Sequence, residues 1–100
     1  MTERELTITV KLSCQTALLG TITPNIRLIT IGWDDLDSFY LKSYYDNSPS
    51  EEDIEEMDAV ITEVIAAVPF KKCRAPECIF DTRPRNQLEL YKWTVYSRKE

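Results

Sequence analysis

The sequence of 100 residues contains no histidine and only two glycines. Without histidine, the chain lacks the usual general base, the usual metal ligand and the usual partner of a serine or cysteine nucleophile. Neither Gly20 nor Gly32 belongs to a glycine-rich loop, which excludes a P-loop and a dinucleotide-binding fingerprint. Because no catalytic signature is present, we predict that the protein is not an enzyme.

Cysteine is scarce as well, with three in the chain. Cys73 and Cys78 do not have the two-residue spacing of a zinc knuckle or a thioredoxin-like site, and Cys14 would be a third ligand without a fourth. The acidic runs lack the alternating ligands and central glycine of a calcium loop. We therefore expect no metal and no cofactor. A Cys73–Cys78 disulfide stays open, although a domain of this size does not need one.

Long apolar runs are absent too. No stretch approaches the roughly 20 residues of a membrane span. The first six residues carry charge of both signs, and no apolar signal segment follows them. We expect a cytoplasmic protein, because the odd number of cysteines also fits a reducing compartment.

What the chain does have is a hydrophobic fraction of 43% and an uneven charge. This composition predicts one folded acidic domain over residues 1–100. Residues 34–63 hold eleven acids and one lysine, a net charge of −10, whereas residues 71–100 hold eight bases and four acids, a net charge of +4. Such an acidic middle repels nucleic acid and anionic membranes and favours a basic protein partner. The alternative is a solvated face whose acids pair with the basic residues of the chain itself.

The clearest element is a helix over residues 48–68. Ser48 and Glu51 have the spacing of a capping box, and Pro49 fits the first helical position. Apolar side chains recur at spacings of three and four and predict the buried face. They are Ile54, Met57, Ile61, Val64, Ile65 and Val68. The opposite side is anionic, with Glu52, Glu56 and Glu63 at its centre.

Residues 5–14 fit two structures. Their alternation of apolar and polar residues is a strand pattern. The alternating apolar residues are Leu6, Ile8, Val10, Leu12 and Cys14. A helical stripe through Leu12, Gln15, Leu18 and Leu19, ending at Gly20, fits the same region. The pattern alone would divide the segment into a strand followed by a short helix.

The remaining segments predict strands. Residues 26–33 and 38–45 form two strands joined by the short polar connector 34–37, which makes them antiparallel neighbours. After the helix, residues 70–81 form a strand interrupted by Pro76, which places that strand at an edge or a bulge. A turn at 82–86 leads to a last strand over 88–97. The aromatic side chains of these strands are core residues by default; because both sides of the strands carry large side chains, the alternative is a tyrosine-rich sheet face that suits a protein interface.

Several short stretches resemble a group of small bacterial proteins of about this length. They are residues 17–20 (ALLG), 23–27 (TPNIR), 33–34 (WD), 45–46 (YD), 50–53 (SEED), 62–65 (TEVI) and 98–100 (RKE). The group is identified as the immunity proteins of polymorphic toxin or contact-dependent growth-inhibition systems. This resemblance implies that the N-terminal segment is a helix. The predicted fold is then a two-layer α+β sandwich with a four-stranded antiparallel sheet and two helices on one face, in the order α-β-β-α-β-β.

The predicted function is binding and neutralisation of a cognate toxin, a basic nuclease-like domain, through an acidic surface. The predicted partner-binding residues are Asp34, Asp35, Asp37, Tyr40, Tyr44, Glu52, Glu56 and Glu63. We expect no nucleic-acid or membrane partner, and a monomer or weak homodimer. The alternative is a non-enzymatic adaptor or structural module that homodimerises through its open sheet face. A carboxylate enzyme without histidine is the third hypothesis.

Overall fold

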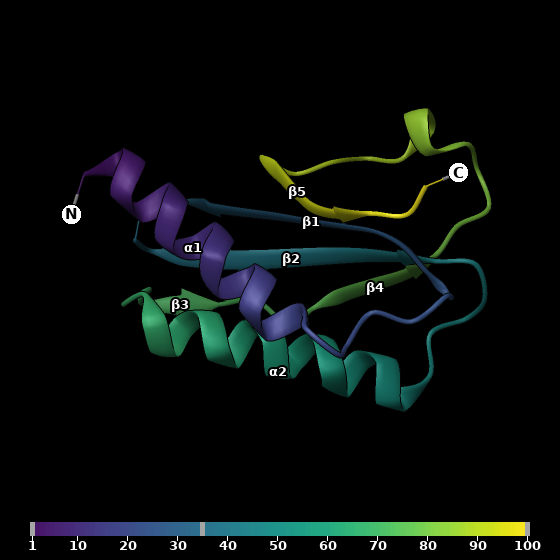
Figure 1. Ribbon diagram of the computed structural model, residues 1–100, viewed down its shortest axis with the longest axis horizontal. Helices are drawn as coiled ribbons and strands as arrows, with labels where there is room; N and C mark the ends of the chain where they lie inside the picture. The colour runs from purple at the N-terminus through teal and green to yellow at the C-terminus, as the bar shows by residue number, and fades with distance from the viewer. Residues whose placement is uncertain (1, 35, 100) are drawn as a thin grey trace.

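A computed structural model describes residues 2–34 and 36–99 of the chain. Two helices and a five-stranded sheet form two layers (Figure 1). The elements in order are α1 (Glu3–Leu18), β1 (Ile26–Asp34), β2 (Ser38–Tyr45), α2 (Glu51–Ala67), β3 (Lys72–Cys73), β4 (Glu77–Phe80), the 3₁₀ turn η1 (Arg85–Gln87) and β5 (Trp93–Ser97). Figure 1 shows α1 crossing the sheet obliquely, while α2 runs along the β2 side. Within the described residues, no helix is both long enough and apolar enough to cross a membrane.

The N-terminal segment is a helix, as the family resemblance implied. Thr2 caps it by accepting a hydrogen bond from the backbone N of Glu5 at 3.1 Å. Threonine and the other β-branched residues of this segment are weak helix formers, but packing of the helix outweighs their low helix propensity. The buried side chains recur at helical spacing and pack mainly against α2. They are Leu6, Val10, Cys14, Ala17 and Leu18. The helical stripe predicted through Leu12, Gln15, Leu18 and Leu19 was largely wrong as a buried face. Of these four residues, only Leu18 is buried.

The long helix forms where it was predicted, but its cap lies two residues later than the proposed one. Ser50, rather than Ser48, caps α2: its Oγ accepts from Asp53 N at 3.1 Å, and Asp53 Oδ2 accepts from Ser50 N at 2.8 Å. Aspartate thus takes the role that the prediction gave to glutamate. The buried face contains Val60 beside the predicted core residues, while Ile54 is 43% exposed. The buried stripe of α2 therefore starts at Met57, one turn later than the predicted start at Ile54.

The sheet is mixed, not the predicted four-stranded antiparallel sheet. β1 and β2 form the predicted antiparallel hairpin, and β5 pairs antiparallel with β1. β3 and β4 both pair parallel to β2, giving the order β3-β2-β1-β5 with β4 beside β2. The physical reason is the length of α2, which spans about 25 Å and returns the chain to the end of the sheet where β2 begins. A strand added there must run in the direction of β2.

The second face of the sheet is partly covered by the chain that precedes β5. The last strand was predicted to start at residue 88, but it starts at Trp93. Leu88 is instead buried against Leu28 and Tyr44. The backbone N of Tyr91 donates to Thr30 Oγ1 at 3.0 Å. Residues 88–91 therefore lie across the face that the sequence left open.

One close contact on this face requires glycine. Gly32 lies opposite Tyr40 in the hairpin, and a Cβ atom added to Gly32 would lie 2.4 Å from Tyr40 Cε2. The ring of Tyr40 is held on its other sides, since Tyr91 meets it edge-on at 4.7 Å between centroids and the Arg74 guanidinium lies 4.5 Å from its centre. The ring can avoid a new methyl group only by breaking these contacts.

We expect Gly32→Ala to lower the free energy of unfolding by about 1–3 kcal/mol, because it overpacks this contact. Urea denaturation measures the loss, and NMR shifts of the Tyr40 ring report its displacement. Gly20→Ala is the control: Gly20 has φ +79° and no atom within 4 Å of an added Cβ, so alanine costs only backbone strain and leaves Tyr40 unmoved. Wild-type stability in Gly32→Ala would contradict the close approach.

Candidate partner-binding surface

The carboxylates of α2 lie on the helix side that does not pack against the sheet. Glu52 and Glu63 are exposed and Glu56 is half-buried, and all three lie to one side of the buried Met57, Val60 and Val64, with Glu56 one turn before Val60. Apart from its capping bonds with Ser50, Asp53 has no polar partner among the described residues. Within residues 2–34 and 36–99, no lysine or arginine lies within 4.0 Å of any α2 carboxylate. The helix therefore presents negative charge that no direct ion pair neutralises.

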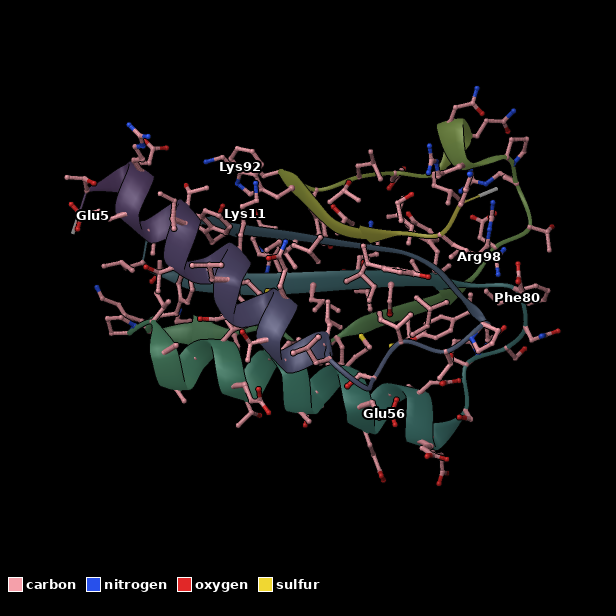
Figure 2. The ribbon with its side chains drawn as sticks, viewed as in Figure 1. Glu5, Lys11, Glu56, Phe80, Lys92 and Arg98 are labelled. Carbon is pink, nitrogen blue, oxygen red and sulfur yellow. The ribbon has the colours of Figure 1, made fainter. Side chains whose placement is uncertain are left out.

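Several bases of the chain pair with acids outside α2. Lys42 is buried and lies 3.6 Å from Glu77 and 3.7 Å from Glu89, on the second sheet face. Lys92 lies 3.6 Å from Glu3. Figure 2 shows Lys11 and Lys92 on the opposite side of the view from Glu56. Ion pairs of Asp34, Lys42 and Asp46 join the acidic and basic segments of the sequence, while the α2 carboxylates take no part in these pairs.

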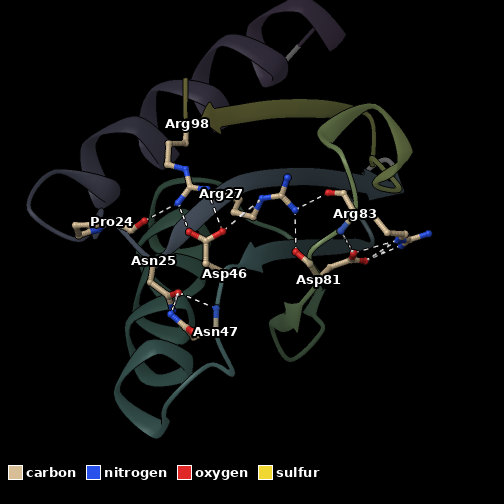
Figure 3. Close-up of polar contacts among 8 residues, drawn as sticks. All are labelled: Pro24, Asn25, Arg27, Asp46, Asn47, Asp81, Arg83 and Arg98. Carbon is tan, nitrogen blue, oxygen red and sulfur yellow. Dashed lines mark hydrogen bonds and ion pairs between the residues drawn. The ribbon is translucent and has the colours of Figure 1, made fainter. Parts of the chain in front are cut away.

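The largest group of ion pairs joins the hairpin to the chain around β5 (Figure 3). Arg27 is 4% exposed, and its Nη1 donates to the backbone oxygens of Asp81 and Arg83, both at 2.8 Å. Asp46 lies between Arg27 and Arg98 and accepts from Arg98 Nη2 at 3.0 Å. Arg98 Nη1 also donates to the backbone oxygen of Pro24 at 2.7 Å. These contacts hold the chain together, and they keep two arginines away from α2.

The hairpin tip forms a second, partly neutralised group. The Asp34 carboxylate lies 3.6 Å from Arg74 Nη2 and accepts from the Tyr40 hydroxyl at 3.3 Å. Burial and the neighbouring Asp34 raise the pKa of Tyr40, so its hydroxyl stays protonated at neutral pH. Asp37 is exposed, and Asp35 lies outside the described residues. The backbone N of Lys71 donates to Leu36 O at 2.9 Å, which places the tip near the C-terminal end of α2.

The structure therefore divides the predicted binding residues into groups. Glu52, Glu56 and Glu63 share one helix surface. The tip lies at the far end of α2 from Glu52. Tyr40 and Tyr44 point to the opposite sheet face, and Tyr44 is 2% exposed, with its hydroxyl donating to Glu89 O at 2.8 Å. The Tyr44 ring thus contributes to internal packing.

The sequence reasoning missed an apolar feature beside α2. Leu12 of α1 is exposed and lines a hollow of about 270 Å³ together with Ser13, Thr16, Glu63 and Ala67. The strand pattern and the helical stripe both placed Leu12 in the core. The helical spacing of Leu6, Val10 and Cys14 is the signal that would have put it outside.

The thiols give no sign of a metal site. Cys14, Cys73 and Cys78 are all free, and burial raises the pKa of the Cys14 thiol to about 12. In the part of the chain that the structure describes, no three histidine, cysteine, aspartate or glutamate side chains gather in a way that could hold a metal ion.

Comparison with known proteins identifies one family. The family model described as MafI2 immunity protein matches residues 7–100. No curated protein matches the chain. The matched region includes the acidic helix, the hairpin and β5, together with all but the first residues of α1.

The Asp81–Arg83 ion pair makes a prediction about acid stability. Hydrogen bonds from the Arg83 guanidinium and backbone lower the pKa of Asp81 to about 2 in the folded chain, from an ordinary value of 3.8. The stability contributed by this lowered pKa is complete above the ordinary value and is lost as the pH falls through about 2. We expect the difference in unfolding free energy between wild type and Asp81→Asn to be constant near neutral pH and to shrink below about pH 4.

Urea denaturation across a pH series measures this difference. Asp58→Asn is the control, because Asp58 lies on the exposed side of α2 and has no ion-pair partner among the described residues. The same pH dependence in both variants would argue against a special role for the Asp81–Arg83 pair.

Proposed function

The chain belongs to the MafI2 immunity protein family, and we propose that it neutralises a cognate toxin by binding it directly through the outer face of α2. Toxin immunity follows from the family. The observation that supports α2 as the binding face is that its carboxylates have no cationic partner within 4.0 Å among the described residues. Unpaired charge is available to an incoming protein, whereas paired charge first has to give up its internal partner.

The chemistry of the surface suggests the class of toxin. A nuclease carries lysine and arginine where it binds phosphate groups, and a row of glutamates on a helix offers the same negative charge. Opposite charges across a forming interface raise the rate of association by about 10- to 1,000-fold. We therefore propose a basic nuclease domain as the partner and occlusion of its substrate surface as the mechanism. The cytoplasm, where nucleic acid is accessible, is the proposed site of action.

Within this surface, Glu52, Glu56 and Glu63 are the central charges. The hairpin tip with Asp34, Asp35 and Asp37 is a peripheral contact for a toxin that extends past the end of α2. Tyr40 lies beside that tip but faces away from α2, and we assign it to the rim. Tyr44 is left out, because its ring and hydroxyl already have partners in the chain.

Toxin binding is favoured over the adaptor hypothesis by the second sheet face. Homodimerisation was expected to use an open face rich in tyrosine. Residues 88–91 lie across that face, with Leu88 buried on it. A second copy would have to displace this segment before it could pair there.

Charge reversal tests the proposal. We expect Glu52→Lys and Glu56→Lys each to slow association about 3- to 10-fold at low ionic strength, because long-range attraction is weakened. The difference should fade at high salt, where charges are screened. Stopped-flow or surface plasmon resonance measures the rate with a cognate toxin domain that carries an inactivating substitution.

Glu89→Lys is the control for net charge, since its exposed side chain makes the same change in charge on the second sheet face, and urea denaturation checks that losing its ion pair with Lys42 leaves the fold intact. Association that is slowed equally by all three variants would point to net charge alone. If none of them slows association, α2 is not the charged part of the interface.

A further inference from the structure

The outward side of α1 carries large apolar side chains that the described part of the chain leaves largely exposed. Ile8 is 49% exposed, Leu12 59%, and Leu19, which caps the helix, 79%. Ile8 and Leu12 are one turn apart and Leu19 follows two turns later, so all three fall within about 40° around the helix axis. We call these three residues the α1 stripe.

The stripe is not part of the internal packing. The buried face of α1, with Leu6, Val10 and Cys14, lies on the opposite side of the helix. Of the seven large hydrophobic residues that are exposed in the described chain, three belong to the stripe. Exposed apolar surface costs about 25 cal/mol per Å² relative to burial, and isoleucine is not a strong helix former, so helix formation alone does not explain these residues.

The α1 stripe meets the acidic face of α2 at Leu12, whereas Ile8 and Leu19 line hollows beside β5. Both helices belong to the layer on one face of the sheet and pack against each other. Leu12 and Glu63 line the same hollow between them. A partner that docks on the glutamates of α2 therefore meets Leu12 next.

We propose that the α1 stripe is the apolar anchor of the toxin interface, and that its occupant is an apolar patch on the toxin bordered by basic residues. This inference rests on the proposed function and adds the second half of the binding surface. Charged residues mainly govern the rate and specificity of encounter, whereas buried apolar side chains near the centre of an interface govern how long the complex lasts.

A second copy of the chain fits this surface less well. Two copies that pair through their α1 stripes bring their α2 helices to the same interface, and the unpaired glutamates then repel one another. An anionic membrane meets the same repulsion. A basic protein surface satisfies both halves, because its charges face α2 while its apolar patch covers α1.

Leu12→Gln tests the anchor. Glutamine has a helix propensity close to that of leucine, and the side chain is exposed, so the fold should be retained. We expect dissociation from the inactivated cognate toxin domain to be about tenfold or more faster, while the salt dependence of association stays as in wild type. Ile8→Gln should act in the same direction.

Leu90→Gln is the matched control. Leu90 is 54% exposed, close to Leu12, but it lines a different hollow with Leu28 and Thr94 at the second sheet face. We expect its dissociation rate to stay within about twofold of wild type, as for a residue outside the interface.

Three outcomes would overturn the inference. If Leu12→Gln and Leu90→Gln dissociate alike while charge reversal on α2 still slows association, the anchor is wrong and the proposed function stands. If the wild-type chain does not bind the toxin domain at all, the proposed function fails and the anchor fails with it. If light scattering shows a dimer that Leu12→Gln converts to a monomer, the stripe is occupied by a second copy.

Discussion

The β1–β2 hairpin is buried on both of its faces, and the rest of the structure depends on this constraint. An antiparallel pair commonly buries one face and leaves the other in water. Here the helices cover one face, while residues 88–91 lie across the other. Every residue of β1 before Asp34 is buried. This double cover explains why aromatic side chains on both sides of the strands serve packing, and why the outer surface of the helices is left for recognition.

The way the second face is closed also explains the separation of charge. Covering it brings the basic part of the chain to the hairpin, where Arg27, Asp46 and Arg98 form one connected group. Lys42 is buried between Glu77 and Glu89 in the same region. Arg27, Arg98 and Lys42 are held by these contacts and lie beyond 4.0 Å from the α2 carboxylates. The fold uses these bases in structural ion pairs, and the α2 carboxylates are therefore left without them.

The sequence predicts α2 and the hairpin well, because each has a strong local pattern: apolar spacing of three and four, and two apolar runs around a short polar connector. Residues 5–14 needed the family resemblance, since threonine and isoleucine favour a strand locally and only contact with α2 makes the helix stable. The parallel direction of β3 and β4 could not be predicted from the sequence, because it depends on the end of the sheet to which α2 returns the chain. The local pattern predicts a strand at Leu88. In the structure Leu88 lies outside a strand and packs against Leu28 and Tyr44, which are far away in the sequence.

The same limits apply to the binding surface. Glu52, Glu56 and Glu63 could be placed together, because one helix carries them. Whether the hairpin tip and Tyr44 join them depends on tertiary structure, and the structure separates them. The α1 stripe was missed because an isoleucine and two leucines are ordinary core residues until the opposite side of the helix is known to be buried.

The pairing of β5 with β1 has a consequence for how the chain is made. Thr30 and Trp93 touch across 63 residues of sequence. During synthesis, β1 emerges from the ribosome long before its outer neighbour exists, so one edge of the sheet has no strand beside it for several seconds at ordinary translation speeds of about 5–20 residues per second. An unpaired strand edge of this kind invites mispairing with other nascent chains. A host that produces this protein in quantity is therefore expected to shield the growing chain with a chaperone until residues 93–97 are available.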